Sequence, residues 1–345
     1  MRDAFIQALT EVALADRRVI LLTGDLGYKL FDDFAARCPG RFLNLGVSEA
    51  NMTSVAAGLA LVGWRPVTYS IVPFVTVRCL EQIRNDVCNM ELPVLVAGVG
   101  GGYAYGVNGA THHGIDDVAV MRSLPGMTVL TPCDPPETRA AVHAVFRQSG
   151  PCYLRLGRNK EPHLTRADDP FELGTPRVLR PGREVAVLAS GPVAAEALQA
   201  ARLLAPAGLD PWVLSVHTVK PLAGVVAWID QHDPRHLFVI EEHGPCGGLA
   251  EGLAGALADR EPHRPLTSLT APDHFFHKVG SQAFLRRAAG PTPTRWPPAS
   301  PADWGSSDED REIALNRDRL LPRRRLGARV LPPPQRGPAG PDASL

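Results

Sequence analysis

The chain has 345 residues, enough for two domains that each bury a core of their own. Its 36 basic and 36 acidic side chains cancel, so charge does not favour nucleic acid or an anionic membrane as a partner. The cysteines are scattered without a C-x-x-C pair, which argues against a zinc site or a disulfide framework. Met1-Arg2-Asp3 leads into an amphipathic segment rather than a signal peptide, and no apolar run is long enough to span a bilayer. We therefore expect a cytoplasmic protein.

Strand and helix patterns alternate through the first part of the chain. Apolar residues at helical spacing predict helices over 3–16, 48–63, 76–90 and 135–148. Short apolar runs predict strands over 19–22, 42–44, 66–70, 93–97, 127–130 and 152–156. The unbroken apolar run over 93–97 is typical of a central parallel strand. The pattern as a whole predicts an α/β domain with a mainly parallel sheet.

A second α/β unit follows a segment rich in Pro, Gly and charge, which we interpret as a linker. Strands are expected over 184–188, 212–216 and 237–240, with helices from Pro192 to 205 and from Gly247-Gly248 to 258. The final segment has proline runs and little periodicity, so we interpret it as an irregular tail with one short helix near 308–320. The predicted fold class is α/β, with two doubly wound domains. The proposed division is a first domain at 1–160, a linker at 161–183, a second domain at 184–290 and a tail at 291–345.

Glu49 lies at the start of the helix predicted for 48–63. Ser48 is a residue type that caps helices, and a carboxylate in the first turn complements the helix dipole. Considered alone, Glu49 is best interpreted as a helix-start charge.

The Gly-rich stretch 98–102 follows a predicted strand but is not a dinucleotide-binding fingerprint. Tyr103 replaces the last glycine of G-x-G-x-x-G, and no helix pattern follows directly. We interpret the stretch as a flexible loop that lets the backbone approach a ligand closely. The sequence also contains no Walker A motif and no G-x-S-x-G nucleophile motif.

His112 and His113 lie between a strand and a helix, where α/β proteins place ligands. Metal binding is disfavoured, because adjacent side chains point in different directions and no third ligand is near in sequence. Two solvated loop histidines remain one alternative, and a histidine that shuttles a proton or donates a hydrogen bond is another. Phe74 ends a strand at the same edge, either as a core residue or as a platform for a flat ring.

In this order, the segments resemble the C-terminal half of transketolase-like enzymes that use thiamine diphosphate. The resemblance covers about residues 1–290 and depends on several motifs that follow one another in the order found in the family. These are Gly24-Asp25-Leu26-Gly27, Gly46-Val47-Ser48-Glu49-Ala50-Asn51-Met52, Phe74 with 81–85, 109–117, 124–129, 217–222 and 239–243.

The resemblance implies roles in cofactor binding. Glu49 is expected to hydrogen-bond N1′ of the aminopyrimidine, which favours the tautomer that activates the thiazolium carbon. Phe74 is expected to stack on the pyrimidine. Ile71 stands where many relatives have a second aromatic wall, and Asp25 and Leu26 are also expected to bind the cofactor.

The resemblance also implies substrate-binding residues. His112 is expected to contact the donor ketose or the covalent intermediate, which makes it the second catalytic candidate beside Glu49. Arg158 lies near the position of an arginine that binds substrate phosphate, and Arg155 is a competing candidate. Asn108 replaces an acidic residue that contacts an acceptor hydroxyl, and no basic group lies in 100–102, where a phosphate-binding histidine is expected. Recognition of a phosphorylated acceptor is therefore not expected.

The motif that holds the diphosphate in this family is absent. Relatives bind the diphosphate and Mg²⁺ through Gly-Asp-Gly in a separate domain, and this sequence has no Gly-Asp-Gly. We therefore expect no metal site on this chain. Thiamine diphosphate is expected to be shared with an N-terminal pyrophosphate-binding transketolase subunit that holds Mg²⁺, in an α₂β₂ assembly.

The implied function is one subunit of a split transketolase, which moves a two-carbon ketol unit from a ketose to an aldehyde through the thiamine diphosphate ylide. Two alternatives are a β-type subunit of a 2-oxoacid dehydrogenase and a split carboligase resembling 1-deoxyxylulose-5-phosphate synthase. A non-catalytic scaffold subunit is an alternative of another class. Thr111-His112 favours the transferase, and retention of Glu49, Phe74 and His112 argues against the scaffold.

Overall fold

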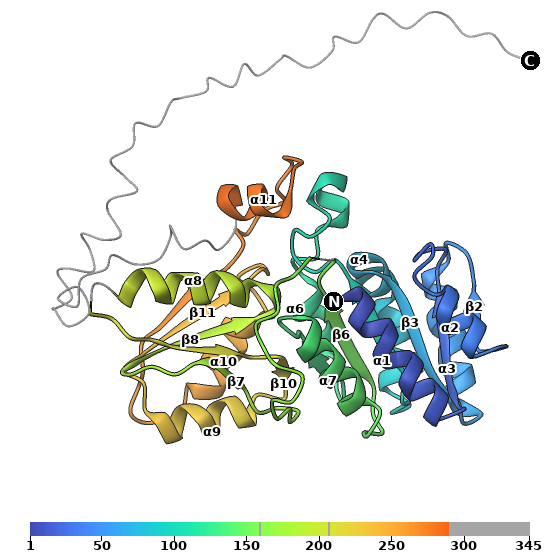
Figure 1. Ribbon diagram of the computed structural model, residues 1–345, viewed down its shortest axis with the longest axis horizontal. Helices are drawn as coiled ribbons and strands as arrows, with labels where there is room; N and C mark the ends of the chain where they lie inside the picture. The colour runs from blue at the N-terminus through green and yellow to red at the C-terminus, as the bar shows by residue number, and fades with distance from the viewer. Residues whose placement is uncertain (159, 206–207, 290–345) are drawn as a thin grey trace, which may run out of the picture. The chain divides into compact units, whose positions relative to one another are not determined.

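The computed structural model describes residues 1–158, 160–205 and 208–289 (Figure 1). These residues form two α/β domains with mostly parallel sheets, so the predicted fold class is confirmed. The tail predicted for 291–345, with its short helix near 308–320, lies outside the described residues.

The first domain contains a seven-stranded sheet with the spatial order β10-β5-β6-β4-β3-β1-β2. All neighbouring strands are parallel except β10, which is antiparallel to β5. The strands are β1 (Val19–Thr23), β2 (Phe42–Asn44), β3 (Arg65–Ile71), β4 (Leu95–Val99), β5 (Thr128–Leu130), β6 (Cys152–Leu156) and β10 (Thr218–Lys220).

Alternate residues of these strands enter two separate cores. In β1, Ile20 and Leu22 pack into a cluster with residues of α3 (Glu49–Leu61). Val19 and Leu21 pack into a second cluster with α1 (Arg2–Ala15) and α7 (Pro135–Val145). Because side chains alternate between the faces of a strand, this division places helices on both faces of the sheet, the doubly wound arrangement.

The second domain contains a five-stranded sheet with the order β12-β11-β8-β9-β7. Its strands are β7 (Arg177–Arg180), β8 (Val185–Ser190), β9 (Trp212–Ser215), β11 (His236–Glu241) and β12 (Leu266–Leu269). Its main helices are α8 (Ala194–Leu204), α9 (Ala223–His232) and α10 (Leu249–Leu257). Figure 1 shows α8 and α9 on opposite faces of this sheet.

The linker interpretation of 161–183 needs correction. β7 lies inside that range and forms the edge of the second sheet, antiparallel to β9. Its two arginines form ion pairs within the fold, the buried Arg177 with Asp169 and Arg180 with Asp210, so charge in this stretch does not mark a linker.

The helix predicted for 76–90 is divided in the structure. It forms the 3₁₀ turn η1 (Val77–Cys79), α5 (Leu80–Gln82) and the π-helical turn η2 (Ile83–Cys88), and the separate turn α4 (Val72–Val75) precedes it. Between α4 and η1, the Thr76 hydroxyl donates to the Val72 carbonyl oxygen at 2.7 Å. Such a side-chain bond competes with the regular helical ladder.

The remaining elements are short connections around these layers. They are α2 (Asp32–Arg37), η3 (Gly106–Asn108), η4 (Ala110–His112), α6 (Asp117–Ser123), η5 (Gly191–Val193) and α11 (Gln282–Ala289). None of the helices in the described ranges is long and apolar enough to cross a membrane.

Buried polar contacts join the two sheets. The Thr131 amide donates to the His217 carbonyl oxygen at 2.7 Å, and the hydroxyl groups of Thr131 and Ser190 lie 2.7 Å apart. The Ser215 hydroxyl donates to the Glu137 carboxylate at 2.8 Å. All five residues are buried, so these bonds replace water contacts that both domains lose at this seam.

His217 gives this seam a pH dependence. Its side chain is fully buried, and burial, followed by the charge of Arg177, lowers its pKa from 6.5 to about 3. Between these values the unfolded chain binds a proton that the folded chain does not bind, so stability falls as the pH falls below 6.5. Lowering the pH from 7 to about 5.5 should therefore reduce the free energy of unfolding by about 1 kcal/mol through His217.

We therefore expect His217→Asn to lose less stability than the wild type over this pH interval, as measured by urea unfolding. His263→Asn is the matched control, because the His263 side chain is 72% exposed. Parallel pH profiles for wild type and His217→Asn would contradict the assignment.

Candidate functional site

The site residues follow parallel strands of the first sheet. Leu26 follows β1, Phe74 follows β3, His112 lies on the loop after β4, and Arg158 follows β6. The carboxyl ends of parallel strands meet at one edge of a sheet, where α/β proteins place ligands. This topology explains why residues far apart in the sequence come together.

Glu49 is the buried carboxylate of this edge. Its side chain is 2% exposed, Oε1 accepts a hydrogen bond from the Ser70 hydroxyl at 3.0 Å, and Oε2 accepts one from Arg78 Nη1 at 2.7 Å. Gly24 permits this position, because a Cβ there would lie only 3.3 Å from Glu49 Cγ. The Glu49 carboxylate therefore bonds Ser70 at the end of β3 and Arg78 in η1, in addition to lying at the start of α3.

Ser48 occupies the N-cap position of α3 but does not cap the helix with its side chain. Its hydroxyl donates instead to the Leu45 carbonyl oxygen at 2.9 Å. The predicted capping bond is therefore wrong, although the predicted start of the helix is correct.

Phe74 contacts both a cation and an imidazole. The Arg78 guanidinium carbon lies 4.3 Å from the centre of the Phe74 ring, and the His112 ring packs edge-on at a centroid distance of 5.1 Å. Phe74 itself is half-buried against the first domain's core. Phe74 therefore packs against the core and also presents its ring to Arg78 and His112, and its role as a platform for a ligand ring stays a prediction.

His112 continues the row of side chains toward Arg158. Its ring lies 6.4 Å from that of Tyr105, and the Arg158 guanidinium lies 4.7 Å from the centre of the Tyr105 ring. The Thr111 hydroxyl lies 3.0 Å from His112 Nδ1. Burial lowers the pKa of His112, which favours a neutral imidazole near pH 7. We call the set Glu49, Arg78, Phe74, His112, Tyr105 and Arg158 the site row.

Sequence reasoning missed Arg78 and Tyr105. Arg78 lies four residues after Phe74, but the predicted helix begins only at residue 76 and the observed helix breaks at Thr76, so helical spacing does not indicate this contact. Nothing in the sequence distinguishes Tyr105 from the neighbouring Tyr103, which instead packs edge-on against His113.

His113 points away from the site row into the protein. It is 4% exposed and contacts Tyr103 at a ring distance of 5.0 Å, while burial lowers its pKa. The alternative of two solvated loop histidines is therefore wrong. Within the described residues, no group of three or more His, Cys, Asp or Glu side chains is arranged to hold a metal ion.

Arg155 is corrected from a substrate-binding candidate to an internal support. Its side chain is 4% exposed, and its Nε donates to Asp117 at 2.8 Å. Its Nη2 donates to the Glu242 carbonyl oxygen at 3.0 Å and also bonds the Gly114 carbonyl oxygen. These contacts hold the His112 loop to β6 and to the second domain. Arg158, which is half-buried, remains the candidate.

The Gly-rich stretch 98–102 packs against the protein rather than against open space. An added Cβ would lie 2.7 Å from Arg155 at Gly101 and 2.5 Å from Glu242 at Gly102. Gly102 also has a positive φ of 63°. The flexible-loop interpretation is therefore wrong, because these glycines make room for the Arg155 and Glu242 side chains.

Four other predicted residues lie at or after the carboxyl ends of β1, β3 and β4. Ile71 is 9% exposed at the end of β3, next to Ser70. Asp25 is exposed and accepts a hydrogen bond from the Asn44 amide at 3.1 Å, while the Leu26 carbonyl oxygen accepts one from the Thr23 hydroxyl at 3.1 Å. Asn108 is exposed on η3. Their roles stay predictions.

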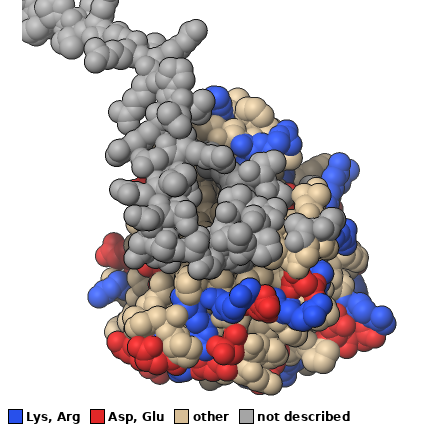
Figure 2. Space-filling model, turned by 90° about the vertical axis from the view of Figure 1, so that its left-hand side faces the viewer, with Lys and Arg blue, Asp and Glu red and all other residues tan. Residues whose placement is uncertain are grey.

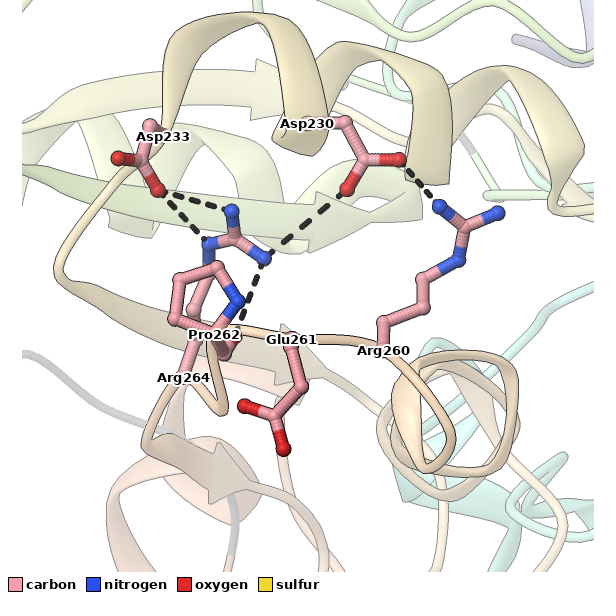
Figure 3. Close-up of a pocket in the computed structure, with 6 residues that line it drawn as sticks. All are labelled: Asp230, Asp233, Arg260, Glu261, Pro262 and Arg264. Atoms are coloured by element: carbon pink, nitrogen blue, oxygen red, sulfur yellow. Dashed lines mark hydrogen bonds and ion pairs between the residues drawn. The ribbon is translucent and has the colours of Figure 1, made fainter.

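A hollow of about 540 Å³ lies elsewhere, on the second domain (Figure 3). Arg264 reaches Asp233 at 2.8 Å and Asp230 at 3.9 Å, and Arg260 pairs with Asp230. Both arginines of the hollow are thus paired with aspartates, so neither is left free to bind an anionic ligand. Acidic and basic side chains are likewise interspersed on the face shown in Figure 2.

The structural role of Arg155 can be measured directly. Replacing it by Met leaves the fully buried Asp117 without its cationic partner, which should lower the free energy of unfolding by about 3 kcal/mol. Arg158→Met is the matched control and should cost about 1 kcal/mol or less, because only a partly exposed cation–π contact is lost. If Arg155→Met and Arg158→Met lost equal free energy of unfolding in denaturant, Arg155 would not have the structural role assigned to it.

Comparison with known proteins defines the class of this chain. Residues 1–162 match the family model for the transketolase pyrimidine binding domain, and residues 174–295 match that for the transketolase C-terminal domain. The chain thus has the two-domain arrangement of enzymes that depend on thiamine diphosphate.

Individual relatives narrow this class. The chain is 36% identical to the 6-deoxy-6-sulfo-D-fructose transketolase subunit SqwH of Clostridium sp. (strain MSTE9), over 85% of this chain and 90% of the relative. It is 32% identical to an apulose-4-phosphate transketolase subunit of Phocaeicola vulgatus, over 79% and 87%. It is also 35% identical to the 1-deoxy-D-xylulose-5-phosphate synthase of Thermomicrobium roseum, over 84% of this chain but only 46% of that longer enzyme.

Comparison with a solved structure also indicates a split transketolase subunit. The structure described as a split gene transketolase, inactive beta4 tetramer, superimposes with a TM-score of 0.78 at 34% identity, over 85% of this chain and 94% of that chain. The chain belongs to the family of split transketolase subunits, and specifically to the subunits that carry the pyrimidine-binding and C-terminal domains.

Proposed function

We propose that this chain is the pyrimidine-binding subunit of a two-chain transketolase, which moves a two-carbon ketol unit from a ketose to an aldehyde. The observation that carries the proposal is the pairing of a buried carboxylate, Glu49, with an aromatic platform, Phe74, at the carboxyl edge of the sheet. The neutral His112 lies directly beside that platform.

The Glu49–Phe74 pair fits the pyrimidine half of thiamine diphosphate. In the structure, a flat N–H donor already lies on both residues, since the Arg78 guanidinium lies over Phe74 and donates to Glu49. An aminopyrimidine with a proton on N1′ presents the same two features, a flat π-system and an N–H group. The pair can therefore stack on such a ring and accept its hydrogen bond.

When bound, thiamine diphosphate supplies the carbon nucleophile that breaks and forms carbon–carbon bonds in this class. Glu49 is proposed to hold a proton at N1′, and Phe74 to fix the plane of the ring. His112, whose pKa is lowered by burial, is proposed to exchange hydrogen bonds with a substrate hydroxyl or carbonyl. Arg158 is proposed to contact the far end of the substrate.

A partner subunit is proposed to complete the site. The sequence has no Gly-Asp-Gly motif for the diphosphate and Mg²⁺, which require hard oxygen ligands. The similar solved chain is described as an inactive beta4 tetramer, which supports the proposal that this chain is inactive without its partner. The proposed assembly is an α₂β₂ heterotetramer in the cytoplasm, with thiamine diphosphate across the subunit interface.

The second candidate is a split carboligase like 1-deoxyxylulose-5-phosphate synthase, which the 35% identity to such an enzyme favours. A 2-oxoacid dehydrogenase subunit and a scaffold subunit have no comparable support. The complex co-purified with the adjacently encoded subunit should transfer a ketol unit from a ketose to an aldehyde without releasing CO₂. Release of CO₂ from a 2-oxoacid would favour the carboligase.

Glu49→Gln tests the central residue. In the two-chain complex, this change should slow exchange of the C2 proton of thiamine diphosphate by at least about 100-fold, because the amide cannot accept the N1′ proton. Exchange is measured by quenched-flow NMR. The control is Glu81→Gln, which replaces an exposed glutamate of the nearby α5. Unchanged exchange in Glu49→Gln would refute the role of Glu49.

Arg158→Met tests substrate recognition. If Arg158 binds an anionic end of the sugar, KM for sulfonated or phosphorylated substrates should rise about tenfold, with KM for uncharged sugars unchanged. The named substrates of two relatives carry a sulfonate and a phosphate. The same substrate series tests a prediction from the sequence, namely that a phosphorylated acceptor is not recognised. A strong preference for the phosphorylated acceptor would contradict that prediction.

A further inference from the structure

Arg78 makes both of the contacts that the pyrimidine ring needs. Glu49 has two carboxylate oxygens, of which Oε1 bonds Ser70 and Oε2 bonds Arg78. The Arg78 guanidinium also covers the Phe74 ring at 4.3 Å. A ring that stacked on this face of Phe74 and bonded Oε2 of Glu49 would use the surface and the oxygen that Arg78 now holds.

The pairing has a clear benefit for the chain without cofactor. Glu49 is 2% exposed, and a buried carboxylate without a cationic partner is strongly destabilising. Arg78 supplies the compensating charge, and its flat guanidinium matches the Phe74 face.

The pairing is also reversible without disturbing the core. The Arg78 side chain is 44% exposed and projects from the short turn η1 rather than from a packed helix. Its long stem can therefore rotate into solvent while Phe74 and Glu49 stay in place.

We propose that Arg78 is a displaceable occupant of the pyrimidine-binding position, which competes with the cofactor in the free subunit and moves away when the ring binds. This inference rests on the proposed function, since it assigns the Glu49–Phe74 pair to the pyrimidine. Arg78 thereby makes the isolated chain bind the cofactor more weakly than the Glu49–Phe74 pair would without it. Cofactor binding is therefore favoured in the two-chain assembly, where the partner also holds the diphosphate.

The test is a titration of the isolated full-length chain with thiamine, which has the pyrimidine but no diphosphate. Calorimetry compares the wild type with Arg78→Met, which keeps the stem but removes the charge and the donors. We expect Arg78→Met to bind thiamine about tenfold more tightly than the wild type. Arg78→Lys, which keeps the charge that Glu49 needs but loses the flat group, should fall between them and serves if Arg78→Met does not fold.

Arg84→Met is the matched control, because Arg84 is an exposed arginine of η2 whose side chain donates to its neighbour Asn85. It should bind thiamine as the wild type does. Equal or weaker binding by the Arg78 variants, or no binding by any variant, would overturn the competition. The proposed function is judged separately, by C2 proton exchange in the two-chain complex, so the two failures are distinguishable.

Discussion

The buried ion pair of Arg155 and Asp117 is the contact on which the site depends most. Arg155 is fixed on the interior strand β6, and Asp117 begins α6 directly after the loop that carries His112. The same guanidinium bonds the carbonyl oxygens of Gly114 and Glu242, so one side chain joins the sheet, the loop and the second domain. A low-dielectric interior makes such a network costly to leave incomplete, which favours a single loop conformation.

This fixed loop places His112 against Phe74, and the rest of the site row follows from parallel topology. The members lie in segments that follow β2, β3, β4 and β6, so the sheet brings together residues that are far apart in sequence. The second domain contributes through Glu242, whose side chain accepts the amide hydrogen of Tyr103 at 2.8 Å. Chemistry in the first domain is therefore positioned partly by the second.

The sequence predicted the fold class and the principal site residues, because long apolar strands and ordered motifs are local signals. The strand at 152–156 and the start of α3 at Glu49 were found at their observed positions. The short strands β7 and β10 were missed, since three or four residues with charged members gain their structure only from distant partners. The burial of Arg155 was missed for the same reason, because its partners come from residues 114, 117 and 242.

The strand β10 has a consequence for the limits of the two domains. It belongs by sequence to the second domain, yet it pairs with β5 and closes one edge of the first domain's sheet. A fragment that ended at residue 160 would leave the β5 edge open, and an unpaired strand edge invites association with other chains. The sheet of the first domain is therefore complete only when the chain extends through β10, which follows the first strands of the second sheet.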